Sequence, residues 1–237
     1  MKLEFIGRGS AFNIKEGNTS AFYKNASGQM LLIDCGESVF ARIIEKQVLE
    51  NVKELYVVIS HTHGDHIGSF TSLAFYMYYI KRQKINLILT PDIKQNETII
   101  KLLNVMGLYD NFINYINVDL LLKNFIGIKD FKFLSTAHYN NLTTYGFEIT
   151  SSDGILYFSS DTNSTDYLKE YLTYENLDKI YVDTCSLDYE NNPHLSIRVL
   201  DEIIPKSQRN KVYCMHIDDS NFIYNLKQMG FNVVENI

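Results

Sequence analysis

The sequence predicts an α/β protein in which two β-sheet layers pack together and helices cover their outer faces. Apolar residues make up 46% of the 237-residue chain, which is enough for a large buried core. Short apolar runs alternate with segments of helical periodicity, which is typical of layered α/β architectures. No linker-like or low-complexity stretch separates the halves, so we expect residues 1–237 to form a single domain.

The first half of the chain contains several segments with strand composition and three with helical periodicity. Strands are expected at 3–6, 19–23, 30–33, 55–59 and 85–89, with two or three short strands between 112 and 134. Helices are expected at 38–49, 67–81 and 94–106, and the last is followed by Gly107, a residue typical of helix ends.

The second half repeats the alternation. The segments at 145–150 and 155–159 predict a hairpin, because the turn between them contains Asp153-Gly154. Further strands are expected at 179–182, 211–215 and 231–234, and helices at 164–172, 196–204 and 221–229.

Charge and hydropathy exclude several classes of partner. The net charge is −6 and the acidic residues are scattered, so no basic stripe is available to follow a nucleic-acid backbone. We therefore do not expect a large nucleic acid as a partner. No run approaches the ~18 apolar residues of a membrane span, and Glu4 interrupts the start of the chain where a signal peptide would stay apolar. We expect a cytoplasmic protein that has no membrane segment.

A dense group of potential metal ligands follows the apolar run at 55–60. Three histidines and one aspartate occur within six consecutive residues, and packing of an apolar core does not explain so many imidazoles in one loop. We therefore predict a metal site at His61, His63, Asp65 and His66.

The remaining three histidines and one further aspartate also lie in loops or directly after expected strands. These residues are His138, Asp161, His194 and His216. Because functional sites form where successive strands end at one edge of a sheet, we expect them near the first group. Imidazole and carboxylate together suit Zn²⁺, with Mn²⁺ or another divalent ion as the alternative.

The order His-x-His-x-Asp-His, then a later His, an Asp and a last His, resembles the metallo-β-lactamase superfamily over nearly the whole chain. The resemblance implies a four-layer αββα sandwich and two divalent metal ions. It also implies which residues bind each of the two ions. One ion would be held by His61, His63 and His138, the other by Asp65, His66 and His216, and Asp161 would bridge both.

Finer motifs resemble the phosphodiesterase branch of that superfamily, which includes tRNase Z. The segments 7–11, 32–37 and 159–162 are similar to three of its motifs. Asp183 stands where the branch has a glutamate, and His194 is similar to the histidine that donates a proton to the leaving oxygen. Asp65, Asp183 and His194 are thus the candidate catalytic residues. Ser196, in the same motif, suits the N-cap of a helix equally well.

These residues fit the chemistry of phosphodiester hydrolysis. Two cations ~3.5–4 Å apart deprotonate a bridging water and neutralise charge that develops on the phosphoryl oxygens. The resemblance implies attack by this hydroxide, with His194 as the general acid. Because the histidine must begin as imidazolium, a nearby carboxylate is needed to raise its pKa, and Asp183 is the candidate.

The chain lacks the inserted arm with which a tRNase Z binds tRNA, and this bears on the size of the substrate. A tRNase Z carries a long inserted arm between its equivalents of His138 and Asp161, but here only 23 positions separate these residues. This compact form is similar to the cyclic-nucleotide phosphodiesterases of the superfamily, including the anti-Pycsar proteins that degrade 3′,5′-cyclic CMP and UMP. The resemblance implies a small cyclic nucleotide as substrate, a homodimer with the aromatic helix near 70–80 as a possible interface, and action in the host cytoplasm if a phage encodes the chain.

Two alternatives remain open. One is a tRNase Z-like RNA endonuclease that lacks the arm, or another nuclease of that branch. The other, from a different class, is a lactonase-type hydrolase or a scaffold used only for binding. The complete ligand set argues against a scaffold without activity, and the pair Asp183 and His194 favours a phosphodiester over a lactone.

Overall fold

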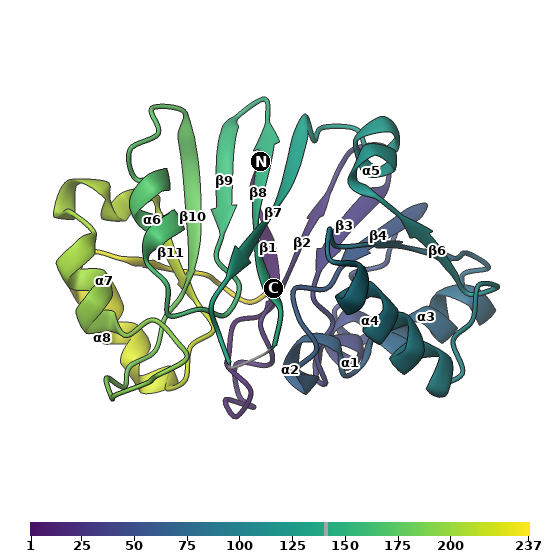
Figure 1. The fold of residues 1–237 in the computed structure, drawn as a ribbon, viewed down its shortest axis with the longest axis horizontal. Helices are drawn as coiled ribbons and strands as arrows, with labels where there is room; N and C mark the ends of the chain where they lie inside the picture. Colours follow the sequence, from purple (N-terminus) through teal and green to yellow (C-terminus); the bar gives the residue numbers. More distant parts are fainter. Residues whose placement is uncertain (140–141) are drawn as a thin grey trace.

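Two six-stranded β-sheets lie face to face in the computed structural model, which describes residues 1–139 and 142–237. Helices α1, α3 and α4 cover the outer face of one sheet, and α6, α7 and α8 cover the other (Figure 1). The expected four-layer αββα sandwich is therefore confirmed. Within the described residues, no helix is both long and apolar enough to cross a membrane.

The first sheet is built from the first half of the chain. Its strands are adjacent in chain order: β1 (Glu4–Gly7), β2 (Ser20–Lys24), β3 (Gln29–Ile33), β4 (Glu54–Val58), β5 (Ile85–Ile88) and β6 (Ile113–Ile116). The first three are antiparallel, and β3 to β6 are parallel. The helices of this half are α1 (Val39–Glu45), α2 (Gly64–Ile67), α3 (Phe70–Tyr79), α4 (Ile93–Val105) and α5 (Val118–Asn124).

The second sheet repeats this topology. Its strands are β7 (Asp130–Thr136), β8 (Thr144–Ser151), β9 (Gly154–Phe158), β10 (Leu177–Asp183), β11 (Val212–Met215) and β12 (Asn232–Val233). Strands β7 to β9 are antiparallel and β9 to β12 are parallel. The helices are α6 (Asp166–Tyr171), α7 (Ile197–Ile203) and α8 (Ile223–Gln228), with 3₁₀ helices at Lys206–Lys211 and Ser220–Phe222.

The apolar runs in the sequence are explained by strands that are buried on both faces. In β4, Leu55 and Val57 join the core beneath the helices, whereas Tyr56 and Val58 join the core between the sheets. Successive side chains of a strand point to opposite faces, so a strand covered on both sides must be apolar throughout. Strand β10 in the second sheet follows the same pattern.

The helix expected at 67–81 is α3, which covers only 70–79, and a separate short helix, α2, ends where the expected helix begins. Helix α2 begins at Gly64 inside the ligand loop, and α3 begins only at Phe70. Between them, the Ser69 hydroxyl donates a hydrogen bond to the Gly36 carbonyl and accepts one from the Phe40 amide. This side chain ties the chain after α2 to the loop after β3, so the break sets the position of the ligand loop.

Helix α5 replaces one of the short strands expected between 112 and 134. The Asn117 side chain accepts a hydrogen bond from the Leu120 amide and caps the helix. Leu121 and Phe125, four residues apart, then pack into the core between the sheets. The cap and the helical spacing outweigh the strand-like composition of this segment.

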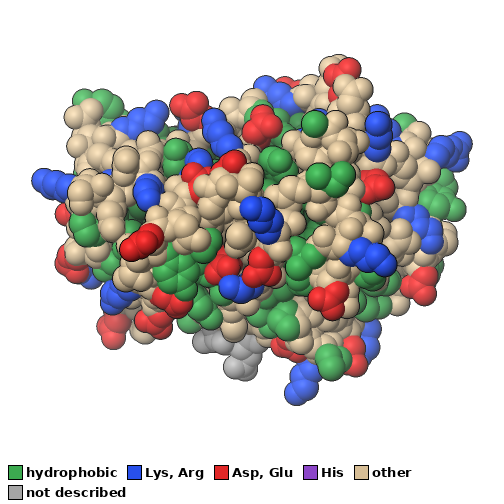
Figure 2. All heavy atoms as spheres, turned by 90° about the horizontal axis from the view of Figure 1, so that it is seen from above, with side chains coloured by type: hydrophobic (Ala, Val, Ile, Leu, Met, Phe, Trp, Pro, Cys, Tyr) green, Lys and Arg blue, Asp and Glu red, His purple; other side chains and the backbone are tan. Residues whose placement is uncertain are grey.

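Parallel strands end at the same edge of a sheet, and this places the loops after β3, β4, β7, β9, β10 and β11 together. In Figure 1 this edge lies toward the bottom, where α2 is labelled. The opposite face is drawn in Figure 2, where Lys and Arg side chains are interspersed with acidic and apolar ones. Among the residues described on that face, they form no continuous basic track.

Candidate metal centre and active site

The loop after β4 and helix α2 supply one half of a cluster of imidazoles and carboxylates. His61 lies three residues after the end of β4, His63 is the N-cap of α2 with an extended backbone, and Asp65 and His66 lie in the helix. His61 and His66 are 0% and 1% exposed. Burial of so many polar side chains is unfavourable unless they bind something.

A first group of ring nitrogens converges on one point. His61 Nε2 lies 3.0 Å from His63 Nδ1, and His138 Nε2, from the loop after β7, lies 3.3 Å from the same atom. Burial, reinforced by neighbouring imidazoles, lowers the pKa of all three rings, most strongly at His61. The rings are therefore neutral at pH 7, with lone pairs available for a cation.

A second group contains both acids and bases. Asp65 Oδ2 lies 3.4 Å from His66 Nε2 and 3.4 Å from His216 Nε2. Burial alone would lower the pKa of His216, but the carboxylates of Asp161 and Asp183 raise it to about 10. Protons and a metal ion therefore compete for this group.

Asp161 lies between the two groups. Its Oδ2 atom is 3.2 Å from the Nε2 atoms of His66 and His216, 3.8 Å from that of His138 and 3.9 Å from that of His61. Burial opposes ionisation, but the imidazoles hold the pKa of this carboxyl well below its usual range. One carboxylate oxygen thus faces both groups, as a shared ligand must.

Asp34 orients the first half of the cluster. Its carboxylate accepts hydrogen bonds from the Ser60 amide and hydroxyl, both at 2.7 Å, and lies 2.8 Å from His66 Nδ1. Because Nδ1 is engaged there, Nε2 of His66 points into the cluster, and this buried atom has no hydrogen-bond partner among the described residues.

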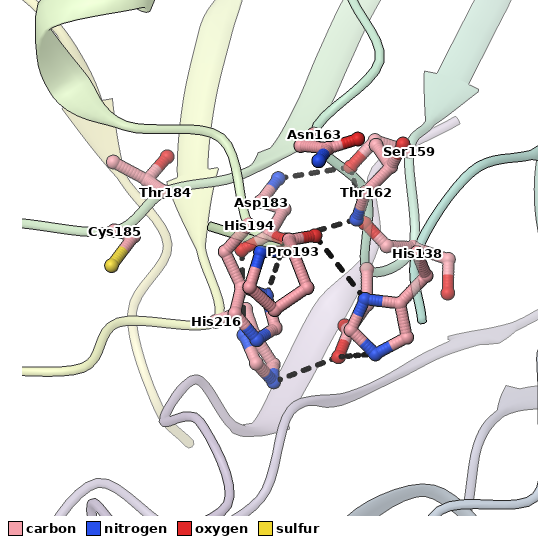
Figure 3. Close-up of polar contacts among 12 residues, drawn as sticks. His138, Ser159, Thr162, Asn163, Asp183, Thr184, Cys185, Pro193, His194 and His216 are labelled. Carbon is pink, nitrogen blue, oxygen red and sulfur yellow. Dashed lines mark hydrogen bonds and ion pairs between the residues drawn. The ribbon is translucent and has the colours of Figure 1, made fainter. Parts of the chain in front are cut away.

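Asp183 orients imidazoles in the second half of the cluster, as Asp34 does in the first half. Its Oδ2 atom lies 2.8 Å from His194 Nδ1 and accepts a hydrogen bond from the Thr162 amide at 3.0 Å (Figure 3). Its Oδ1 atom lies 3.3 Å from His216 Nδ1. The sequence predicts the first of these contacts but not the second. The second depends on the parallel register in which Asp183 pairs with Met215, the residue before His216.

His194 lies in the loop between β10 and α7, and its side chain is 23% exposed. Its ring stacks on that of His216 and lies close to that of His138, with centroids 4.8 and 5.0 Å apart. Burial alone would lower the pKa of His194, but the Asp183 carboxylate more than offsets this, so its pKa lies above the ordinary value. The preceding Pro193 carbonyl is 3.2 Å from His138 Nδ1 and fixes that ring (Figure 3).

Three residues at strand ends have left-handed backbones that the sequence did not indicate. They are Asp34, Ser160 and His216, with φ of 62°, 55° and 56°. This conformation is uncommon for residues other than Gly, although Asp and His adopt it more often than most. It turns the chain sharply after β3, β9 and β11, so that the side chains following these strands enter the cluster.

A cavity of about 540 Å³ opens over the cluster. Its walls include His63, Asp65, His138, Asp161, His194 and His216. Among the described residues that line it, none is Lys or Arg. Imidazoles and carboxylates that converge at the floor of a cavity of this size suit divalent metal ions beside a small ligand.

Known proteins share both the sequence pattern and the fold. The profile of the family "Anti-Pycsar protein Apyc1" matches residues 1–236. The anti-Pycsar protein Apyc1 of Bacillus phage BSP38 is 30% identical over 245 residues, covering 92% of this chain and 90% of the relative.

Solved structures agree on the fold. The metallo-β-lactamase fold protein YhfI from Bacillus subtilis has a TM-score of 0.72 at 17% identity and covers 99% of this chain and 96% of that one. The short form of human tRNase Z has a TM-score of 0.70 at 15% identity, with 100% and 96% covered. The fold is thus that of the metallo-β-lactamase superfamily, and by its sequence the chain belongs to the anti-Pycsar protein Apyc1 family.

Proposed function

We propose that this protein hydrolyses 3′,5′-cyclic nucleotides, with cyclic CMP and UMP as the first candidates, and so counteracts a bacterial immune signal. The observation that carries the proposal is the pair of Asp183 and His194 beside the cluster, in a cavity without Lys or Arg among its described lining residues. Membership of the anti-Pycsar family supports the same substrate class.

We assign the ligands of two divalent ions from the distances in the cluster. His61, His63 and His138 would hold one ion, Asp65, His66 and His216 would hold the other, and Asp161 would be shared between them. Zn²⁺ is our first choice because imidazole dominates the donor set, with Mn²⁺ as the alternative. When bound, two such ions supply an activated water and neutralise charge on the phosphoryl oxygens.

His194 provides the general acid. Its Nδ1 faces Asp183, which leaves the other ring nitrogen to donate a proton to the sugar oxygen that leaves phosphorus. The Asp183 carboxylate raises the pKa of His194 and so favours the protonated ring, and the contact with Asp183 fixes the orientation of that ring. Asp183 acts only through His194 and His216, so it is a positioning residue.

The charge of the cavity favours a small substrate over RNA. A cyclic mononucleotide carries one negative charge, which the ions and the protonated His194 can match without further cations. A long RNA needs many phosphate contacts to Lys and Arg. The interval between His138 and Asp161 contains β8 and β9, and residues 140–141 in it lie outside the described residues.

We also propose that the protein is a homodimer that acts in the cytoplasm of an infected host. The helix suggested as the interface offers less free aromatic surface than its sequence indicates. Phe75, Tyr78 and Tyr79 of α3 pack around Phe112 of the same chain, with centroids 5.1, 4.7 and 5.9 Å away. Tyr79 and Ile80 remain 52% and 64% exposed.

The test is a substrate panel with the metal-loaded protein. Cyclic CMP, UMP, AMP and GMP, cyclic dinucleotides, a pre-tRNA and an acyl lactone are incubated separately, and products are separated by liquid chromatography. We expect a linear mononucleotide from at least one cyclic mononucleotide, and two equivalents of metal per chain by elemental analysis. Turnover of pre-tRNA or the lactone alone would favour the corresponding alternative and refute the proposal.

A further inference from the structure

The rim of the cavity is apolar and aromatic, in contrast to its floor. Phe12 lies on one wall, in the loop after β1, and Leu187 and Tyr189 lie on another, in the loop after β10. These side chains are 95%, 60% and 55% exposed. Exposure of large apolar side chains at a cavity mouth is unfavourable in water and is typical of surfaces that bind a ligand.

The turn that carries Phe12 is held firmly by its backbone. The Ser10 amide and the Asn13 side chain donate hydrogen bonds to the Ile217 carbonyl at 3.1 and 2.9 Å, and the Ile217 amide donates to Arg8. Ile217 directly follows His216, so this turn is attached to the cluster. The fold thus fixes where Phe12 lies while leaving its ring almost fully in solvent, and packing of the chain does not account for the ring.

The opposite wall is fixed in a similar way. The Ser186 amide and hydroxyl donate hydrogen bonds to Asp218 at 2.9 and 2.7 Å, and the Asn192 side chain donates to the Leu187 carbonyl. The same loop continues to His194. Tyr189 therefore belongs to the same anchored loop as His194 and lines the same cavity.

We propose that Phe12 and Tyr189 hold the base of the cyclic nucleotide by contact with their rings, an inference that rests on the function proposed above. With no Lys or Arg among the described lining residues, affinity beyond the phosphate must come largely from apolar contact. Bases present flat apolar faces, and aromatic rings bind them by stacking. A base held at the rim places the cyclic phosphate at the floor of the cavity.

The test compares Michaelis constants for the best cyclic nucleotide. Phe12→Ala and Tyr189→Ala should each raise KM about tenfold, because this is the usual effect of losing one stacking contact, and change kcat much less. Phe12→Tyr and Tyr189→Phe keep the ring and should retain the wild-type KM. Ile14→Ala is the matched control, because Ile14 is 85% exposed in the same turn but is not among the residues that line the cavity.

A spectroscopic test uses the absence of tryptophan from the chain. Phe12→Trp introduces a single tryptophan at the rim, which can be excited selectively over the 17 tyrosines. A non-hydrolysable phosphorothioate analogue of the cyclic nucleotide should quench its fluorescence in the metal-loaded protein. Ile14→Trp should not be quenched.

The outcomes separate this inference from the proposed function. If the wild type turns over a cyclic nucleotide but the Phe12 and Tyr189 variants keep its KM, only the inference is wrong. The same holds if Phe12→Ala changes the oligomeric state in light scattering and leaves KM unaltered, because the ring would then serve a contact between copies. If the wild type has no activity on any cyclic nucleotide, both proposals fail.

Discussion

The two sheets build the candidate site in different ways. The first sheet contributes His61, His63, Asp65 and His66 from one loop and the short helix that follows it. The second sheet contributes one side chain from each of several separate segments: His138, Asp161, Asp183, His194 and His216. The first group depends mainly on local backbone geometry, whereas the second depends on how parallel strands are aligned.

Each half nevertheless contains the same pair, a buried aspartate 2.8 Å from an imidazole Nδ1. In the first half, Asp34 orients His66, which is almost fully buried in the cluster. In the second half, Asp183 orients His194, whose side chain reaches the cavity and is 23% exposed. The two pairs therefore differ in exposure, and we propose the buried ring of His66 as a metal ligand and the partly exposed ring of His194 as the proton donor.

The largest effect is expected from Asp161→Ala, which removes the carboxylate that both halves share. Turnover should fall by more than about 10⁴, because the metal ions supply several kcal/mol of transition-state stabilisation. Bound metal should fall with it in elemental analysis. Asp119→Asn, an exposed aspartate in α5, is the control and should keep both. Full metal content and activity in Asp161→Ala would contradict the bridging role.

The next effect is expected from His194→Gln. Its kcat for a cyclic nucleotide should fall by about 10² to 10⁴, the usual contribution of a general acid. Hydrolysis of bis(p-nitrophenyl) phosphate should fall much less, since p-nitrophenolate leaves without a proton. Metal content should be unchanged, and loss of metal would instead place His194 among the ligands.

The two aspartates provide a matched comparison, Asp183→Asn against Asp34→Asn. Each should lower activity or metal affinity about 10- to 100-fold, as loss of a carboxylate that orients a ligand does. They should differ in pH dependence. His194 is active when protonated, so activity is lost as pH rises through its pKa. Removing the Asp183 charge lowers that pKa and should move the basic limb of the kcat/KM profile to lower pH.

Asp34→Asn should leave the position of this limb unchanged, because Asp34 contacts His66 rather than His194. If Asp183→Asn and Asp34→Asn shift the basic limb equally, the proposal that only Asp183 controls the pKa of the proton donor is wrong.

The smallest effect is expected at the helix caps. Ser196 accepts a hydrogen bond from the Val199 amide and caps α7, as Asn117 caps α5 in the first half. Ser196→Ala and Asn117→Ala should each cost about 1 kcal/mol of stability, which corresponds to about 2–4 °C in Tm for a domain of this size. Thermal melts measure both. If Ser196→Ala leaves Tm unchanged, the result would argue against the N-cap role and favour a role of Ser196 in the motif that contains His194.

The sequence alone determined the fold class and much of the site. The apolar run at 55–59 predicted the strand β4, and the order of histidines and aspartates predicted which superfamily the chain resembles. These features are readable because periodicity and ligand spacing are local properties of the chain. The pairing of Asp183 with His194 was also predicted, since both belong to recognisable motifs.

Only the tertiary structure decided the rest. The contact of Asp183 with His216 follows from the register of β10 and β11. Residue type alone does not single out Asp34, Ser160 and His216 from the other aspartates, serines and histidines as positions with a left-handed backbone. The exposed ring of Phe12 became visible only when its loop was placed beside His216. Such features depend on contacts between segments distant in the chain, and no pattern within one segment encodes them.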